Sequence, residues 1–361
     1  MVPVVDLSRW GAEVADTFAA QVADVARRGV YLLGDETRGL EADLARWATG
    51  GGEQPAHAVA VASGATALQL TLRALGVGPG DEVIVPAFTA VPTASAVAAL
   101  GATPVLVDVE ADTANLDPCL VEPARTARTR AVVVVHLYGR PATLPDTDLP
   151  IVEDAAQAQG ALGHDRRSAA VAYSFYPTKN LGGIGDGGAV VSTDRDLIDR
   201  VARLRTHGMT AQYVHDEVSQ NFRLSEIEAA WLRLGLPHLA TWNERRRHIA
   251  SRYREAAPHL GWQTPHQRHS YHLCVARFAE RNTARARLAE LGVGTAVHYP
   301  LAVNQQPAYR CISRTAYPQA EAWAAECVSL PCFPHLTDAE VETVAEALAA
   351  LPPHLALGGH P

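Results

Sequence analysis

The chain has 361 residues, 48% of them hydrophobic, and this length and composition allow one or two domains with a large core. Its formal net charge of −8 argues against a nucleic-acid-binding protein. Five scattered cysteines without a C-x-x-C pair, and fifteen histidines without an H-E-x-x-H pattern, give no disulfide framework or metal site and favour a reducing, cytoplasmic setting.

The first part of the chain predicts helices and then the start of an α/β sheet. Its N-terminus lacks the apolar core of a signal peptide. The expected elements are an arm over 1–12, helices over 14–28 and 35–49, a strand over 57–62 and a helix over 67–75. A glycine cluster over 50–52 is expected to end the second helix.

The turn Ser63-Gly64-Ala65-Thr66 joins that strand to the next helix. A small-residue turn at a helix N-terminus can bind an anion, because free backbone N–H groups and the positive end of the helix dipole point to one place. Ser63 as a plain N-cap is the alternative. The turn alone leaves both interpretations open, and the lysine described below favours phosphate binding.

The stretch Val83–Val107 carries no charge over 25 residues and is long enough to cross a membrane. Pro86, Pro92 and Pro104 interrupt it, so we expect a strand, a loop, a helix and a strand inside a protein core, and no membrane span. Later, Ala131–Val135 is the kind of apolar run that a doubly covered parallel sheet contains.

Strands that alternate with helices across residues 57–205 predict an α/β fold with a mostly parallel sheet. His136 follows one of these strands, where it could reach a site at the sheet edge. A hydrogen-bonded core histidine fits this position about as well.

Lys179 is the only lysine among the 31 lysine and arginine residues. Arginine supplies positive charge elsewhere but cannot provide a neutral amine, so we expect Lys179 to have a chemical role. It lies in a polar loop between strands expected at 171–175 and 189–192, and Asp154 ends an apolar run 25 residues earlier. An amine and a carboxylate so placed fit Schiff-base chemistry, with the carboxylate beside a pyridinium nitrogen.

The segment Gly183–Gly188 matches the dinucleotide-binding pattern G-x-G-x-x-G. That pattern requires a strand before it and a helix after it, whereas this segment follows a polar loop and precedes a strand. We therefore do not expect a nicotinamide cofactor.

The C-terminal part is expected to form a smaller domain. An arginine-rich helix over 239–255 follows a helix over 226–236, which Ser225 could cap. We place the boundary between 1–238, the arm and large domain, and 239–361, the small domain. Its expected elements are a strand over 272–278, helices over 283–291 and 337–351, and an unstructured tail over 352–361.

Three motifs carry a resemblance to a known family: Glu153-Asp154-Ala155-Ala156-Gln157, Ser174-Phe175-Tyr176-Pro177-Thr178-Lys179-Asn180-Leu181 and Gly185-Asp186-Gly187-Gly188. They resemble the DegT/DnrJ/StrS-type sugar aminotransferases, pyridoxal-phosphate enzymes of the type I aspartate-aminotransferase fold. The resemblance implies that Lys179 binds pyridoxal 5'-phosphate covalently and acts as the general base, and that Asp154 keeps the pyridinium protonated.

The resemblance also assigns the remaining cofactor contacts. Gln157 would bond the phenolic oxygen, and Ser174 would hold the phosphate together with the turn from Gly64 through Ala65 to Thr66. Asn221 would reach the phosphate in the neighbouring subunit, which implies a homodimer with shared active sites. His298 and Tyr299 would contact the substrate.

Two positions depart from the family pattern. Ala65 stands where a threonine usually follows the glycine, and Ala90 stands where an aromatic residue usually stacks on the pyridine ring. Either Phe88 or another group covers that face, or the site is roomier there, and we expect looser cofactor binding.

The expected reaction moves an amino group from L-glutamate or L-glutamine to a keto group of a nucleotide-linked, dTDP-type deoxysugar. Cyclitol aminotransferases and enzymes that make aromatic amino acids belong to the same family, and no residue in the sequence separates them. A regulatory protein that binds the cofactor without turnover is a further alternative, which the retained Lys179, Asp154 and Gln157 argue against.

Overall fold

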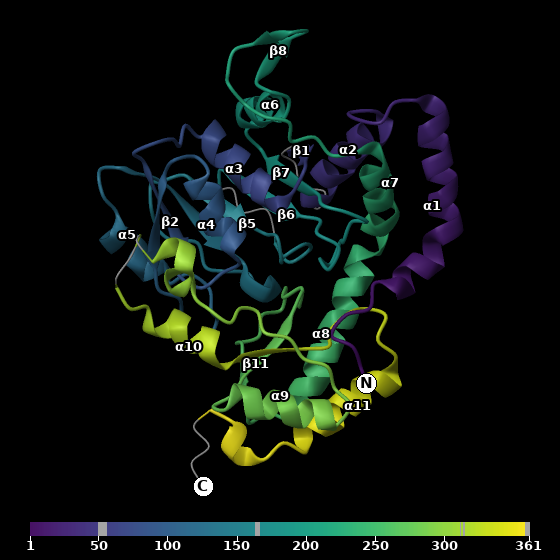
Figure 1. Ribbon diagram of the computed structural model, residues 1–361, viewed down its shortest axis with the longest axis vertical. Coiled ribbons are helices and arrows are strands. Elements are labelled where there is room, and N and C mark those ends of the chain that lie inside the picture. Colours follow the sequence, from purple (N-terminus) through teal and green to yellow (C-terminus); the bar gives the residue numbers. More distant parts are fainter. Residues whose placement is uncertain (50–55, 163–166, 311, 313–314, 358–361) are drawn as a thin grey trace.

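A computed structural model describes residues 1–49, 56–162, 167–310, 312 and 315–357. Within these ranges the chain forms an α/β structure with two main sheets (Figure 1). The helices are α1 Ser8–Arg28, α2 Asp35–Thr49, α3 Gly64–Ala74, α4 Val91–Ala98, α5 Val121–Ala124, α6 Arg195–Leu204, α7 Glu226–Gly235, α8 Leu239–Ala256, α9 Arg281–Glu290, α10 Pro318–Glu326 and α11 Asp338–Ala349.

The larger sheet has seven strands in the order β1-β7-β6-β5-β4-β2-β3. Neighbours from β6 to β3 pair in parallel, whereas β7 runs antiparallel to both β6 and β1, so the sheet is mostly parallel as predicted. Its strands are β1 His57–Val61, β2 Glu82–Pro86, β3 Thr103–Val107, β4 Thr129–Val135, β5 Ile151–Asp154, β6 Ala170–Ser174 and β7 Gly188–Ser192.

Helices cover this sheet on both faces, and the sequence of β4 shows why. Along this fully apolar run, Val133 and Val135 belong to the core that includes α3, α4 and α6, while Val132 and Val134 belong to a second core on the opposite face. Successive side chains of a strand point to opposite faces, so a strand buried on both sides must be apolar throughout. Helices α2 and α7 cover the sheet where β1, β6 and β7 lie, and they form a further core with these strands.

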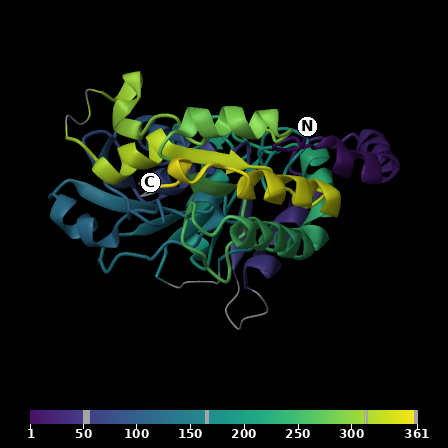
Figure 2. The ribbon, with the colours of Figure 1, turned by 90° about the horizontal axis from the view of Figure 1, so that it is seen from below.

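The C-terminal part contains an antiparallel sheet in the order β10-β11-β12, formed by Gly261–Trp262, Cys274–Arg277 and Cys327–Leu330. It packs with α8, α9 and α11 around a core of its own. Figure 2 shows α9 and α11 crossing this part of the molecule. The N-terminal arm reaches it too, because Val2 bridges to Val293.

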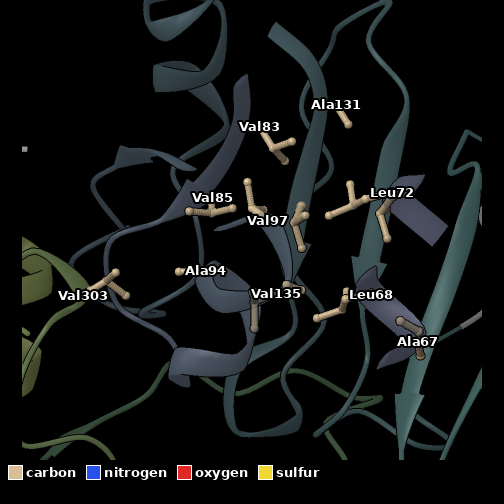
Figure 3. Close-up of a cluster of buried hydrophobic side chains, with 14 of the residues drawn as sticks. Ala67, Leu68, Leu72, Val83, Val85, Ala94, Val97, Ala131, Val135 and Val303 are labelled. Carbon is tan, nitrogen blue, oxygen red and sulfur yellow. The ribbon is translucent and has the colours of Figure 1, made fainter. Parts of the chain in front are cut away.

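The expected domain boundary after residue 238 stays a prediction. The two sheets lie on either side of it in the chain, yet one core crosses it: Val303 belongs to the same core as Val85 of β2 and Ala94 of α4 (Figure 3). Trp323 of α10 belongs to the same core. Val303 and α10 are therefore attached to the core of the large sheet, although they lie late in the chain.

Most expected elements are present within a few residues of their predicted ends, including the strand, helix and strand within 83–107. The tail is a correction. Residues Pro353–Leu355 form a helical turn, Leu355 is buried, and Ala356 bridges to Phe278, so apolar contacts order the chain at least to there. The glycine cluster 50–52 and residues 358–361 lie outside the described ranges. None of the described helices is both long and apolar enough for a membrane crossing.

A two-stranded hairpin, β8 Met209–Ala211 and β9 Val214–His215, was not predicted. It extends beyond α6 at the top of Figure 1, away from the rest of the chain. Tyr213 at its turn is 85% exposed and Val218 just after it is 89% exposed. Such apolar exposure on an extended ribbon is a feature of surfaces that meet another protein.

Candidate active site

Lys179 lies on the loop that leaves β6 at Ser174 and enters β7 at Gly188. Local hydrogen bonds shape this loop: the Lys179 N–H donates to the Tyr176 carbonyl at 2.8 Å, and the Gly183 N–H donates to the Phe175 carbonyl at 2.7 Å. Burial lowers the pKa of the Lys179 amine to about 8, against the opposing charge of Asp154. A neutral, nucleophilic amine is thus accessible close to physiological pH.

Asp154 is buried at the carboxyl end of β5, within electrostatic reach of Lys179. Its Oδ2 accepts a hydrogen bond from the Thr93 hydroxyl at 2.8 Å, and its Oδ1 accepts one from the Ala156 N–H at 3.1 Å. The Thr93 and Thr89 hydroxyl oxygens lie 3.1 Å apart. Because Thr93 donates to the carboxylate, Thr89 donates to Thr93, and this chain fixes the orientation of the carboxylate.

The predicted anion-binding turn closes around Ser174. Ser63 is the N-cap of α3, and its Oγ accepts from the Thr66 N–H at 3.1 Å and lies 2.9 Å from the Thr66 hydroxyl oxygen. A Cβ on Gly64 would lie only 2.5 Å from the Ser174 Cβ. A Cβ on Gly188 would approach the Ser63 carbonyl to 2.4 Å. Only glycine lets these three segments meet.

Gln157 links the Asp154 segment to the C-terminal part of the chain. Its Oε1 accepts from the Tyr138 N–H at 2.6 Å, and its Nε2 donates to the Tyr299 hydroxyl at 3.0 Å. Burial raises the pKa of Tyr299 to about 12, so this phenol stays protonated. His298 lies next to it, with Nδ1 2.8 Å from the Ser329 Oγ.

Asn221 lies apart from this group. Its side chain is exposed and accepts a hydrogen bond from Arg223 Nε at 2.8 Å. An exposed position is what a residue that serves a neighbouring subunit requires. His136, by contrast, is a hydrogen-bonded core residue: its Nε2 lies 2.9 Å from the Glu153 Oε2, and its Nδ1 accepts from the Ala142 N–H at 2.9 Å.

The arrangement around Ala90 bears on whether Phe88 covers the pyridine face that lacks the usual aromatic residue. Phe88 is fully buried, and its ring stacks 6.5 Å from Trp323 and meets Tyr138 and Tyr299 edge-on. It belongs to a packed core and is not free to cover a cofactor ring. Ala90 is partly exposed at the N-terminus of α4, so its small side chain leaves that face open.

The sequence matches the model of a known protein family over most of its length. Residues 13–349 match the DegT/DnrJ/EryC1/StrS aminotransferase family. The chain belongs to this family. The sequence resemblance is thereby confirmed, and the protein is a pyridoxal-phosphate-dependent aminotransferase.

Named relatives and solved structures agree with that assignment. The chain is 43% identical to the dTDP-3-amino-3,4,6-trideoxy-alpha-D-glucose transaminase of Streptomyces venezuelae, across 96% of this chain and 95% of the relative. It is 41% identical to the erythromycin biosynthesis sensory transduction protein EryC1 of Saccharopolyspora erythraea, across 97% and 99%. The crystal structure of S. venezuelae DesV in complex with a ketimine intermediate superposes with a TM-score of 0.90 at 42% identity, across 96% and 97%.

The site of this aminotransferase fits pyridoxal phosphate on its own geometry. In the glycine-lined turn at Ser63–Thr66, the Thr66 N–H is capped by Ser63, and the N–H groups of Gly64 and Ala65 are offered to a phosphate, next to the Ser174 hydroxyl. Lys179 offers an amine with a lowered pKa, and Asp154 offers a fixed carboxylate within electrostatic reach of it. Phosphate, aldehyde and pyridine nitrogen therefore each have a partner of the right chemistry.

Several side chains that organise the site were not predicted. Thr93 orients Asp154, and Gln159 donates to the Ser174 carbonyl at 2.8 Å and to the Leu181 carbonyl at 3.2 Å while accepting from the Leu181 N–H at 2.8 Å. Gln159 lies two residues after Gln157, so its place just beyond that motif was the signal that could have revealed it. Thr93 had no such signal, since a threonine in the first turn of a helix is common.

Proposed function

We propose that this chain transfers an amino group from L-glutamate or L-glutamine to a keto group of a dTDP-linked deoxysugar, in the biosynthesis of an amino sugar of secondary metabolism. The observation that carries the proposal is the only lysine of the chain, held beside Asp154 with its pKa lowered to about 8. The 43% identical S. venezuelae relative, named as a dTDP-amino-sugar transaminase, supports the substrate class.

In this reaction Lys179 and Asp154 control the position of protons. When bound, pyridoxal phosphate supplies the electron sink for the carbanion that forms at the donor's α-carbon. Lys179 holds the cofactor, and once the donor displaces it, the neutral amine takes the proton from that carbon. Asp154, fixed by Thr93, keeps a proton on the pyridine nitrogen.

The remaining residues bind and orient. Gln157 bonds the phenolic oxygen, and Ser174 binds the phosphate together with the turn from Gly64 through Ala65 to Thr66. Tyr299 is held beside Gln157, where its protonated hydroxyl can donate to a substrate oxygen, with His298 next to it. These roles are proposals that rest on the positions described above.

We also propose a cytoplasmic homodimer in which each active site uses both chains. The exposed Asn221 side chain and the apolar residues of the β8–β9 hairpin, Tyr213 and Val214 among them, support this assembly. Asn221 of one chain would bind the phosphate held by the other chain. Its removal should therefore weaken cofactor binding without affecting the fold of its own chain.

The visible absorption spectrum of the cofactor-loaded protein tests the proposal. Addition of L-glutamate or L-glutamine should bleach the band of the cofactor bound to Lys179, and a dTDP-linked keto sugar should then restore it while an amino sugar forms. If a keto cyclitol restores the band and keto sugars do not, the substrate class is wrong. If no amino donor changes the spectrum, the protein binds the cofactor without turnover.

A further inference from the structure

A hollow lies beside the lysine loop, on the side of the small sheet. Its main polar lining residues are Thr178, Arg246, His272 and His298. We call the cavity that these four residues line the basic hollow. Thr178 immediately precedes Lys179. Apolar side chains, including Leu330 and Phe333, form the other walls, and no described aspartate or glutamate lines it.

His272 is buried in this hollow without a hydrogen-bond partner. It is 7% exposed, its Nδ1 is buried and unpaired, and neither ring nitrogen has a partner among the residues that the structure describes. Burial, and then the charges of Lys179, Arg246 and His298, lower its pKa. Burial, and then the same Lys179 charge, lower the pKa of His298, so both imidazoles lie within electrostatic reach of the lysine.

Arg246 is the second unusual group. It is 4% exposed, its Nη1 donates to the backbone carbonyls of Cys332, Tyr271 and His272, and its Nε is buried without a partner. Within the described ranges it forms no ion pair with a carboxylate, and burial lowers its pKa.

Other arginines of the chain show the contrast. Arg200 pairs with Glu217, and Arg233 pairs with Glu36. Asp6 lines the adjoining hollow together with Arg246, but its carboxylate is bonded to Ser8 and Arg9. A buried cation without a counter-ion is costly unless an anion joins it.

We propose that the basic hollow binds the carboxylate of the amino donor through His272 and Arg246. This inference rests on the proposed transamination and names how its first substrate is held. An amino acid carries its carboxylate one carbon away from the amine, so a donor whose nitrogen replaces Lys179 must place its carboxylate next to that lysine. The hollow is adjacent to Lys179, has the Arg246 guanidinium and the unpaired His272 imidazole to receive a carboxylate, and has apolar walls to accept methylene groups.

Glutarate tests the proposal, because it carries the carboxylates and methylene groups of glutamate but lacks an amine and cannot react. Its dissociation constant for the cofactor-loaded protein is measured by calorimetry for the wild type and for His272→Asn. We expect binding to weaken at least roughly tenfold, as for the loss of a charged hydrogen bond. Arg246→Gln should weaken it as much or more.

Arg245→Gln is the matched control. Arg245 is the neighbour of Arg246 on α8, but its Nη2 bonds the Leu336 carbonyl and Asp338, away from the basic hollow. Glutarate binding should not change in this variant. Arg246→Gln also removes hydrogen bonds to three backbone carbonyls. If this variant does not fold, the His272→Asn variant alone decides the outcome.

Three results would overturn the inference: no glutarate binding by the wild type, wild-type binding by His272→Asn, or a loss of dTDP binding in His272→Asn while glutarate binding persists. The last would show that the hollow holds the nucleotide diphosphate. The proposed transamination can fail independently. In that case the His272→Asn variant still loses glutarate binding, while the loaded wild type accepts no keto sugar.

Discussion

Asn243, on α8, accepts a hydrogen bond from the Asn180 side chain at 2.7 Å, and Asn180 directly follows Lys179. The Asn243 Nδ2 donates in turn to the Gln159 carbonyl at 2.7 Å, two residues beyond Gln157. Asn180 also donates to the Ser270 carbonyl at 2.9 Å. A single buried amide therefore connects the lysine loop and the chain just after the Asp154–Gln157 segment to the helix that leads into the C-terminal part.

Replacing Asn243 by leucine should destabilise the folded protein. The substitution removes both hydrogen bonds and leaves the Gln159 carbonyl buried without its donor, which predicts a loss of about 2–4 kcal/mol in the free energy of unfolding. Urea denaturation measures this loss. Ser251→Ala, at an exposed position of the same helix, should change it by less than about 0.5 kcal/mol. Equal stability of both variants would show that Asn243 does not join the segments energetically.

The lowered pKa of Lys179 predicts how cofactor capture depends on pH. Only the neutral amine attacks an aldehyde, so the rate should rise about tenfold per pH unit below pH 8 and level off above it. Stopped-flow absorption after mixing cofactor-free protein with pyridoxal phosphate gives the rate. Lys179→Arg, which leaves no lysine in the chain, should not show the absorption band of lysine-bound cofactor at any pH. A rate that keeps rising to pH 10 would mean that the amine has its ordinary pKa.

The same shift predicts a pH dependence of stability. Between about pH 8 and the ordinary value of 10.5, the unfolded amine holds a proton that the folded amine has lost. The cofactor-free protein should therefore become more stable as the pH rises through this window. In Lys179→Met that contribution should be absent. If the free energy of unfolding changes with pH in the same way in the wild type and in Lys179→Met, the lowered pKa of Lys179 is contradicted.

Gly64→Ala should disturb the phosphate-binding turn. Its Cβ would lie 2.5 Å from the Ser174 Cβ, so the turn and β6 must separate, at a cost of about 1–3 kcal/mol of stability. The cofactor dissociation constant should rise as well, because both segments are proposed to bind the phosphate. Gly78→Ala is the control, since a Cβ there meets nothing within 4 Å. If Gly64→Ala matches this control in both measurements, the close approach is not required.

The strands and the catalytic pair could be predicted from the sequence because their signals are local. A doubly covered strand such as β4 is apolar along its core-forming run, and Lys179 is the only lysine in the sequence and lies within a family motif. The alternation of strands and helices then placed Asp154 at a strand end, where the structure has it.

The features that could not be predicted depend on long-range contacts. Asn243 lies 63 residues from Asn180, and nothing in either local sequence distinguishes them from exposed amides. The β8–β9 hairpin consists of exposed residues, so it lacks the alternation that burial imposes on a strand. The ordered tail depends on Phe278 and Ala356, which are far apart in the chain.

Ala90→Phe should strengthen cofactor binding. Phe88 is committed to its contact with Trp323, so Ala90 is where a stacking ring is missing. A stacked ring adds about 0.5–1.5 kcal/mol, which corresponds to a roughly twofold to tenfold lower dissociation constant. Equilibrium dialysis with pyridoxal phosphate measures it. Ala90→Leu adds apolar bulk without a ring and should gain less. An unchanged constant in Ala90→Phe would contradict the hypothesis that the small side chain loosens the site.

Complementation between two inactive variants tests whether the active sites are shared. Lys179→Ala removes the amine, and Asn221→Asp places a carboxylate where the neighbouring chain's cofactor phosphate is proposed to lie. If Asn221 serves the partner's site, a mixed dimer has one site with both defects and one site with neither. Random mixing makes half of the dimers mixed, so about a quarter of the wild-type activity should return after the two variants are unfolded and refolded together.

Lys179→Ala mixed with Asp154→Asn is the matched control for that experiment. Both residues are proposed to act within one chain, so every site of a mixed dimer keeps one defect and activity should not return. If neither mixture regains activity although mixed dimers form, Asn221 acts within its own chain. Tyr213→Asp in the hairpin should then be examined by sedimentation, because loss of dimers in that variant would separate a role of the hairpin in assembly from the place of Asn221.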